Sequence, residues 1–171
     1  MEIKNAAYWI HRLQLQEHPE GGYYAEVYRS EESISKDGLP DRFEGPRSMG
    51  TSIYFLLHGD TFSAFHRIKS DEGWHFYTGN HPVHLYVIAP DGTLTEHMLG
   101  TDFEARQKFQ AVVPTGHWFA ARAGYAQEDY ALVGCTVSPG FDFQDFEMAE
   151  REELLKQFPQ HEVLIKRFTR E

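Results

Sequence analysis

Eight short runs rich in β-branched and aromatic residues follow one another between residues 51 and 137. They read TSIYFLL, TFSAFHRI, WHFY, VHLYVIA, TLTEHML, FQAVVP, HWFAAR and YALVGCTV. Turn-forming residues separate them, as in Pro90-Asp91-Gly92 and Pro114-Thr115-Gly116. Many short strands at near-regular spacing are typical of a β-sandwich or a β-barrel.

The flanking segments have other patterns. Residues 6–16 place apolar side chains at helical spacing, which predicts a short amphipathic helix, and YYAEVYRS predicts a further strand. Residues 31–48 are polar and contain proline and glycine, so they predict a surface loop that is either a lid or a hairpin tip. The tail from about Phe146 has helical periodicity, interrupted at Pro159. Without a repeat or a linker, residues 1–171 are expected to form a single domain.

Composition excludes several classes of function. The 171 residues contain 16 lysines and arginines against 26 acidic residues, a formal charge of −10, which disfavours nucleic-acid binding. No stretch of about 18 apolar residues occurs, so we expect no membrane association and a cytoplasmic location. The single cysteine, Cys135, cannot form an intramolecular disulfide and is expected to fill the core.

His66 is the central candidate residue. Side chains alternate between the two faces of a strand, so His66 shares a face with Phe62, Ala64 and Ile68. This face is the more apolar one apart from the histidine, and we therefore expect His66 to point into the barrel. A buried imidazole needs a hydrogen-bond partner, because an unpaired polar group inside a protein costs roughly 1–3 kcal/mol. It is either a satisfied core residue or part of a site.

The surrounding residues resemble the sequence motifs of the cupin superfamily. Gly59, His66, Glu72 and Gly79 match the first motif, but Ile68 replaces its second histidine. Pro114-Thr115-Gly116 matches the start of the second motif, where Phe119 replaces the last metal-binding histidine. Because carbon cannot replace a nitrogen donor, we predict no metal cofactor. A divalent transition metal would need another ligand set, namely His66, Glu72, His75 and His117.

The longer stretches HPEGGYYAEVYRS, SAFHRIKSDEGWHFYTG, VVPTGHW and SPGFDFQDFE resemble the Cupin_5 family (DUF985). This resemblance implies an all-β fold: a single cupin barrel (double-stranded β-helix, or jelly roll) with an N-terminal helix and C-terminal helices. It also implies a homodimer. Members of this family are similar to the metal-free dTDP-4-dehydrorhamnose 3,5-epimerase branch of cupins, which uses a barrel histidine held by an aspartate as base and a tyrosine as acid.

Transferred to this chain, the resemblance assigns His66 as the base. Imidazole titrates near neutrality, and its second nitrogen could be oriented by Glu72, Asp142 or Asp145. Tyr28 is the candidate acid, and because it shares strand parity with Glu26, either both face the barrel or neither does. The predicted catalytic residues are thus His66, Tyr28 and Asp142.

The remaining predictions concern the walls of the cavity. The candidate substrate-binding residues are Glu26, Ser63, Glu72, Trp74, His75 and Trp118. Several have structural alternatives: Trp74 and Trp118 could fill the core, His75 could face outward, and Asp142 or Asp145 could cap a helix. Glu20 could reach the mouth of the cavity, whereas we assign His18 to a surface or turn.

The leading functional hypothesis is a metal-independent isomerase or epimerase that acts on a small carbonyl or sugar-like compound inside the barrel. The first alternative is a non-catalytic protein that binds a small molecule in the same cavity. The second is a metal-dependent cupin oxygenase or hydrolase.

Overall fold

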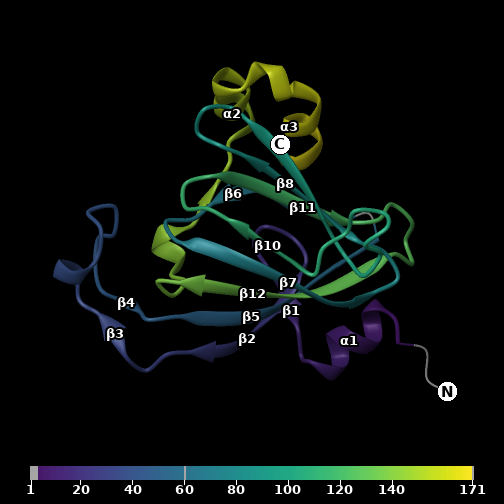
Figure 1. Cartoon of the computed structure of the whole chain (residues 1–171), viewed down its shortest axis with the longest axis horizontal. Coiled ribbons are helices and arrows are strands. Elements are labelled where there is room, and N and C mark those ends of the chain that lie inside the picture. The colour runs from purple at the N-terminus through teal and green to yellow at the C-terminus, as the bar shows by residue number, and fades with distance from the viewer. Residues whose placement is uncertain (1–3, 60, 171) are drawn as a thin grey trace.

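Two antiparallel β-sheets face each other in the computed structural model, which describes residues 4–59 and 61–170 (Figure 1). The six-stranded sheet has the order β1 (Gln16–Glu17), β2 (Tyr23–Arg29), β5 (Thr51–His58), β12 (Tyr130–Ser138), β7 (Asp71–Gly79) and β10 (Gln110–Val113). The five-stranded sheet has the order β13 (Glu147–Met148), β6 (Ser63–Arg67), β11 (Trp118–Ala123), β8 (Val83–Ile88) and β9 (Leu94–Leu99). The all-β, jelly-roll prediction is confirmed.

The main hydrophobic core lies between the inner faces of the two sheets. Alternate residues of each strand point inward, so Phe55 and Trp74 of the six-stranded sheet meet Leu85 and Phe119 of the other. All four side chains are almost completely buried. This packing fills one part of the interior, and the candidate site occupies another.

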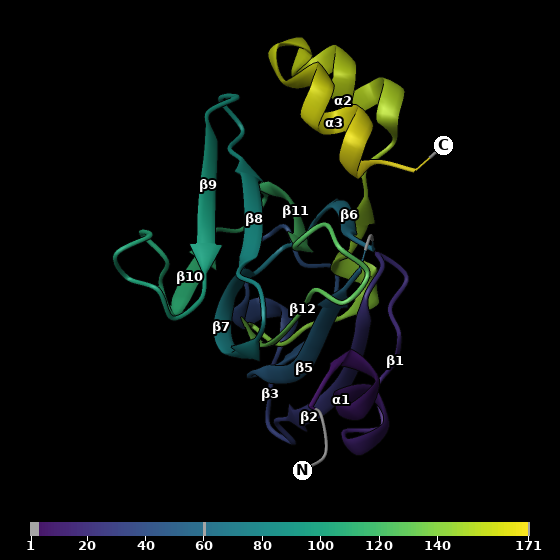
Figure 2. The same ribbon diagram turned by 90° about the vertical axis from the view of Figure 1, so that its right-hand side faces the viewer.

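Short helices cover the outer faces of the sheets (Figure 2). The first helix, α1 (Ala6–Arg12), covers part of the six-stranded sheet, where Trp9 and Leu13 pack against Leu56 and Leu132. At the other end of the chain, α2 (Arg151–Gln157) and α3 (Glu162–Phe168) lie against the five-stranded sheet, joined by η3 (Pro159–His161). Both terminal helical regions agree with the sequence pattern. None of the helices within residues 4–59 and 61–170 is long and apolar enough to cross a membrane.

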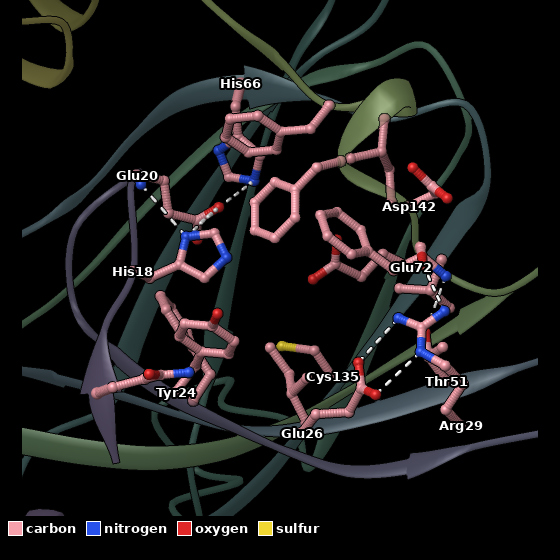
Figure 3. A pocket seen from close by; sticks show the side chains of 18 residues that line it. His18, Glu20, Tyr24, Glu26, Arg29, Thr51, His66, Glu72, Cys135 and Asp142 are labelled. Carbon is pink, nitrogen blue, oxygen red and sulfur yellow. Dashed lines mark hydrogen bonds and ion pairs between the residues drawn. The ribbon is translucent and has the colours of Figure 1, made fainter.

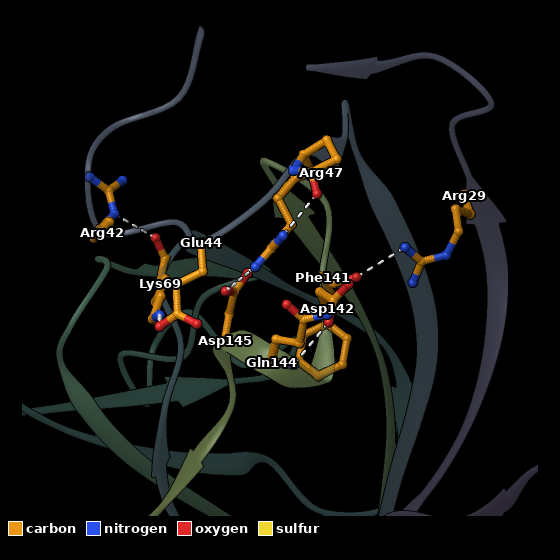
Figure 4. Close-up of polar contacts among 10 residues, drawn as sticks. Arg29, Arg42, Glu44, Arg47, Lys69, Phe141, Asp142, Gln144 and Asp145 are labelled. Atoms are coloured by element: carbon orange, nitrogen blue, oxygen red, sulfur yellow. Dashed lines mark hydrogen bonds and ion pairs between the residues drawn. The ribbon is translucent and has the colours of Figure 1, made fainter. Parts of the chain in front are cut away.

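The segment 31–48 forms a hairpin at its base. Its strands β3 (Ser33–Ile34) and β4 (Arg47–Ser48) pair with each other, and η1 (Lys36–Gly38) lies between them. At the end of this segment the Arg47 guanidinium donates two hydrogen bonds of 2.7 Å to Asp145, and both side chains are only 3% exposed (Figure 4). The hairpin is thereby tied to η2 (Phe143–Asp145), which forms part of the cavity wall.

Two β-bulges change the alternation of side chains near the site. On β2, Glu26 pairs with Ile53 and Tyr28 with Ser52, so β2 carries one extra residue at this point. On β6 the pairing to β11 shifts between Ser63 and His66 in the same way. Since an extra residue reverses the parity of everything beyond it, simple alternation fails at these two positions.

Candidate functional site

A cavity of about 340 Å³ opens between the sheets beside His66 (Figure 3). Strands β1, β2, β5, β6, β7 and β12 contribute to its wall, and the segment 141–146 closes one side. Its apolar lining consists of Ile53, Phe55, Ile68, Val137, Phe141, Phe143 and Phe146. Its polar lining consists of Gln16, His18, Glu20, Tyr24, Glu26, Arg29, Thr51, His66, Glu72, Cys135 and Asp142. An aromatic cavity with a few convergent polar groups is the usual form of a small-molecule site.

The turn between β1 and β2 brings Glu20 into this cavity. Gly21 has a φ of +110°, a region that favours glycine, and a Cβ at this position would overlap the carbonyl oxygen of Phe62. The close approach lets the Glu20 carbonyl accept a hydrogen bond of 2.8 Å from the Ala64 amide. The turn is therefore tied to the start of β6, and the Glu20 side chain lies beside that strand.

Glu20 and His66 form a buried ion pair. The Nε2 atom of His66 lies 2.9 Å from Oε2 of Glu20, and the Ser63 hydroxyl donates a 2.8 Å hydrogen bond to Oε1. Burial by itself opposes both charges. The charge and hydrogen bond of Glu20, together with the Glu72 charge and the Ala64 carbonyl, nevertheless outweigh burial and raise the pKa of His66. The charge and hydrogen bond of His66, together with His18 and Ser63, lower the pKa of Glu20. The pair is therefore an imidazolium facing a carboxylate.

Both nitrogens of the His66 ring are occupied. Nδ1 lies 2.7 Å from the Ala64 carbonyl oxygen, which can only accept, so Nδ1 carries a proton. Nε2 donates to Glu20, and the ring is 2% exposed and packs 4.0 Å, centroid to centroid, from Phe119. His66 faces the barrel interior as expected, but no ring nitrogen is left to contact a ligand.

His18 is a second histidine in the cavity wall, and its tautomer follows from its contacts. Its Nδ1 accepts a hydrogen bond of 3.2 Å from the Glu20 amide and lies farther, 3.5 Å, from Oε2 of Glu20. With the amide as the nearer partner, we assign the proton of the neutral ring to Nε2. Burial lowers the pKa of His18 against the opposing attraction of Glu20, which favours this neutral form. Figure 3 shows the other ring nitrogen on the side away from Glu20, facing the cavity.

Glu72 supplies a carboxyl group with an unusual protonation equilibrium. The side chain projects from β7 into the cavity and is 8% exposed. Burial, together with repulsion from Glu20, raises its pKa from 4.5 to about 7, although the nearby His66 charge opposes the shift. Cys135, also in the lining, has its thiol pKa raised by burial and by Glu72. Glu72 therefore changes protonation state near neutral pH.

The rim of the cavity carries a second ion pair. Arg29 donates from Nε and Nη2 to the two carboxylate oxygens of Glu26, at 2.9 and 2.8 Å, and from Nη1 to the Phe141 carbonyl oxygen at 3.0 Å. Asp142 lies close by and caps η2, since its Oδ1 accepts a hydrogen bond from the Gln144 amide. Glu26, a predicted substrate-binding residue, and Asp142, a predicted catalytic residue, thus both lie in the cavity wall.

The cupin fold implies a metal ion, but the donor atoms do not fit one. Two of the motif positions hold Ile68 and Phe119, whose carbon atoms cannot coordinate, and both nitrogens of His66 are engaged. Within residues 4–59 and 61–170, no group of three or more His, Cys, Asp or Glu side chains is arranged to hold a metal.

The alternative ligand set of His66, Glu72, His75 and His117 does not converge. His75 lies on the outer face of the six-stranded sheet, where its Nε2 is 2.9 Å from the Thr136 hydroxyl. The Nδ1 atom of His117 contacts a backbone carbonyl of its own turn, and this residue lies outside the cavity lining.

Four further predicted site residues lie outside the cavity lining. Tyr28 is 56% exposed, because the β2 bulge separates its orientation from that of Glu26; the assumption of shared parity was wrong. Trp74 belongs to the main core, and Trp118 packs under the C-terminal helices beneath the Arg67 guanidinium. Ser63 is completely buried and acts on the cavity only through its hydrogen bond to Glu20.

Sequence reasoning missed His18, Tyr24 and Arg29 and gave Glu20 only a place at the cavity mouth. We expected Glu72, Asp142 or Asp145 to orient His66, whereas the partner is Glu20. Asp145 instead pairs with Arg47 and is not the helix cap. The available signal was the stretch HPEGG, in which two consecutive glycines mark a tight turn that carries polar side chains.

Comparison with known proteins gives three close relatives. A hypothetical protein from Leishmania major is 37% identical with a TM-score of 0.88, covering 98% of this chain and 100% of that one. Protein SO0799 from Shewanella oneidensis is 39% identical with a TM-score of 0.86, covering 98% and 99%. The uncharacterized protein YML079W of Saccharomyces cerevisiae is 30% identical over 164 residues, covering 86% of this chain and 76% of its own.

More distant likeness extends to other cupins. Oxalate decarboxylase from Bacillus subtilis superimposes with a TM-score of 0.53 at 14% identity, over 89% of this chain and 36% of that one. Such a likeness shows the fold alone. The family model described as "Cupin superfamily (DUF985)" matches residues 7–149. The chain therefore belongs to the Cupin_5 (DUF985) family of the cupin superfamily.

Proposed function

We propose that this protein is a metal-independent isomerase or epimerase that moves a proton at a carbon next to a carbonyl group, with Glu72 as the acid–base residue. One observation carries the proposal: a cavity-lining carboxyl group whose pKa is raised to about 7. A group that titrates near the working pH is well suited to take up and return a proton, and strongly perturbed groups in cavities are candidates for catalysis.

In this proposal Glu72 takes the place that the resemblance assigns to His66. A base needs a free lone pair, and the hydrogen bonds of His66 to Ala64 and Glu20 leave none. His66 is instead a positioning residue. Its charge balances Glu20 and acts against the rise in the pKa of Glu72, which keeps that pKa near neutrality.

The reaction step balances without a cofactor. The Glu72 carboxylate takes the proton of the carbon beside the carbonyl, and the C–H electron pair becomes the new C=C bond. The carbonyl π pair moves to oxygen, which becomes an enolate. The Nε2–H group of neutral His18 is suited to donate a hydrogen bond to this oxygen. Glu72 then returns the proton to the former carbonyl carbon, using the C=C electron pair. The hydroxyl oxygen on the first carbon becomes the new carbonyl, and its proton passes to the enolate oxygen, which completes an isomerisation.

The relationship to the metal-free dTDP-4-dehydrorhamnose 3,5-epimerase branch belongs to this proposal as its precedent. The chain has a histidine–carboxylate pair, His66 and Glu20, between its two sheets, and its described residues contain no metal ligand set beside that pair. The tyrosine in the cavity wall is Tyr24 and not Tyr28, and Tyr24 is a candidate second proton donor for an epimerisation.

The test follows the incorporation of solvent deuterium into dihydroxyacetone and fructose by NMR. We expect Glu72→Gln to slow incorporation at least 10²-fold, on the order of the usual general acid–base contribution. Glu31→Gln, which removes an exposed carboxylate, is the matched control and should leave the rate unchanged. Carbon-13 NMR of labelled glutamate should place the Glu72 carboxyl pKa near 7. A carboxyl that titrates near 4.5, or undiminished incorporation in Glu72→Gln, would refute the assignment.

A second candidate function is the binding of a small molecule without chemistry. It is favoured by the fully engaged ring of His66, because a locked ion pair inside a preformed aromatic cavity suits recognition as well as catalysis. Wild-type protein that binds fructose and returns it with no deuterium would favour this candidate over the isomerase.

A further inference from the structure

We propose that the cavity selects a polyhydroxylated carbonyl compound that carries no anionic group, such as a free sugar, and rejects its phosphate ester. This inference names the class of compound that the site takes. Treating that compound as a substrate rests on the proposed function. It derives from the charges and hydrogen-bonding valences of the cavity wall, which can be measured independently of any reaction.

The charges of the wall do not balance. Four acidic residues line the cavity, Glu20, Glu26, Glu72 and Asp142, against two cationic side chains, His66 and Arg29. Each cation already has its own carboxylate, because His66 pairs with Glu20 and Arg29 with Glu26. Glu72 and Asp142 are left without a dedicated cation among the lining residues that the structure describes. The formal charge of the wall is therefore negative even when Glu72 is protonated, and more so when it is ionised.

Neither described cation of the wall is without its own carboxylate. Arg29 uses three of its five N–H groups, two on Glu26 and one on the Phe141 carbonyl, and its charge is balanced by Glu26; both nitrogens of His66 are engaged inside the wall. Arg29 also attracts Asp142, which further reduces its free positive potential. A phosphate oxygen placed near this rim would meet carboxylates at short range. The formal charge of −10 on the whole chain adds repulsion at longer range.

The acidic rim of the wall leaves open acceptor valences. Oδ1 of Asp142 accepts from the Gln144 amide, whereas its Oδ2 has no hydrogen bond among the described residues. An ionised carboxylate can only accept, so a partner must donate. The hydroxyl groups of a sugar supply such donors, and a phosphate dianion supplies none.

The apolar part of the wall suits the same ligand. Phe141, Phe143 and Phe146 form a connected group of rings beside the acidic rim, with ring centroids 4.9–6.4 Å apart. Phe55 lines the cavity from β5 of the six-stranded sheet. Such rings pack against the C–H faces of a sugar while the carboxylates receive its hydroxyl groups. A volume of about 340 Å³ accommodates a monosaccharide.

The experiment compares matched pairs by ligand-observed NMR titration at low salt: dihydroxyacetone with its phosphate, and fructose with fructose 6-phosphate. We expect the unphosphorylated member of each pair to bind at least about tenfold more tightly. A phosphate ester that binds as well or better would overturn the inference, and so would the absence of binding by both unphosphorylated compounds. Glucosamine, which adds an ammonium donor, should bind no more weakly than fructose; weaker binding would count against an acceptor-rich rim.

A variant tests whether the acidic rim of the cavity causes the discrimination against phosphate esters. Asp142→Asn removes one charge while keeping an oxygen that can cap η2, so folding should be preserved. We expect it to reduce the discrimination against the phosphate esters at least about threefold. Asp37→Asn, an exposed carboxylate on η1 outside the cavity lining, is the matched control with the same change in net charge. Equal discrimination in the two variants would refute the role given to the rim.

The outcomes separate this inference from the proposed function. If the unphosphorylated compounds bind more tightly but take up no deuterium, the selectivity is supported and the isomerase activity is rejected. If the phosphate esters take up deuterium, the isomerase activity is supported and the proposed selectivity is rejected.

Discussion

Glu72→Gln is expected to stabilise this protein above neutral pH, although it removes the proposed acid–base residue. The reason is that Glu72 must ionise where it is buried, only 8% exposed, and close to the Glu20 carboxylate. The glutamine side chain has nearly the same shape and cannot ionise. The variant therefore keeps the packing of the wall while it removes the charge.

The sign and size follow from the pKa. Folding raises the pKa of Glu72 from 4.5 to about 7, so between these values the folded state binds more protons than the unfolded state. Glu72 thus contributes stability below about pH 4.5, and this contribution is lost as the pH rises through about 7. Each pKa unit is worth about 1.4 kcal/mol, so the total loss is about 3 kcal/mol.

The assay is urea unfolding of wild type, Glu72→Gln and the exposed control Glu31→Gln at several pH values between about 4 and about 8. The free energy of unfolding of Glu72→Gln, relative to wild type, should rise by about 3 kcal/mol across this range. Taking the difference cancels the other titrating groups. The control should show no such trend. A difference that stays flat, or that falls with rising pH, would refute the raised pKa and with it the proposed chemistry.

Three other perturbations test the supports of the cavity. Glu20→Gln should lower the pKa of His66, because it removes the attraction of the buried carboxylate, and NMR titration of the imidazole checks this; an unchanged pKa would contradict the ion pair. Asp145→Asn should lower the unfolding free energy by about 3–5 kcal/mol, since it leaves Arg47 buried without its carboxylate. The double variant Arg47→Met/Asp145→Leu should recover most of this lost stability, as measured by thermal unfolding. Gly21→Ala should cost more than about 1 kcal/mol, because its φ of +110° and the adjacent backbone carbonyl leave no room for a Cβ, and unchanged denaturant unfolding would argue against the tight turn.

Much of the fold was predictable from local patterns. Strands between residues 51 and 137, the amphipathic N-terminal helix and the interrupted C-terminal helices all follow from the spacing of apolar residues, which each element imposes separately. The N-terminal helix ends at Arg12, earlier than its pattern suggested, because the chain turns at Gln14, where φ is +54°. The inward direction of His66 was also predictable, as was the loss of metal donors at Ile68 and Phe119.

The composition of the site was less predictable. Strand alternation carries information only while the pairing is regular, and the β2 bulge separated Tyr28 from Glu26. For the same reason, strand alternation could not predict that Ser63 and His66, on either side of the β6 bulge, contact the same carboxylate. Trp74 and His75 had been left between two interpretations, and the sheet registers placed them in the core and on the outer face.

By itself, the sequence determined that this chain forms a β-rich cupin fold with a histidine turned inward and too few donors for the usual metal site, because these properties depend on periodicity and on residue type. Only the tertiary structure decided which carboxylate meets that histidine. Glu20 and Ser63 are 43 residues apart in the chain and become neighbours through the glycine turn packed against β6. It also decided that Glu72 is the group that titrates near neutrality, because a pKa reflects burial and nearby charge, which arise only when distant strands come together.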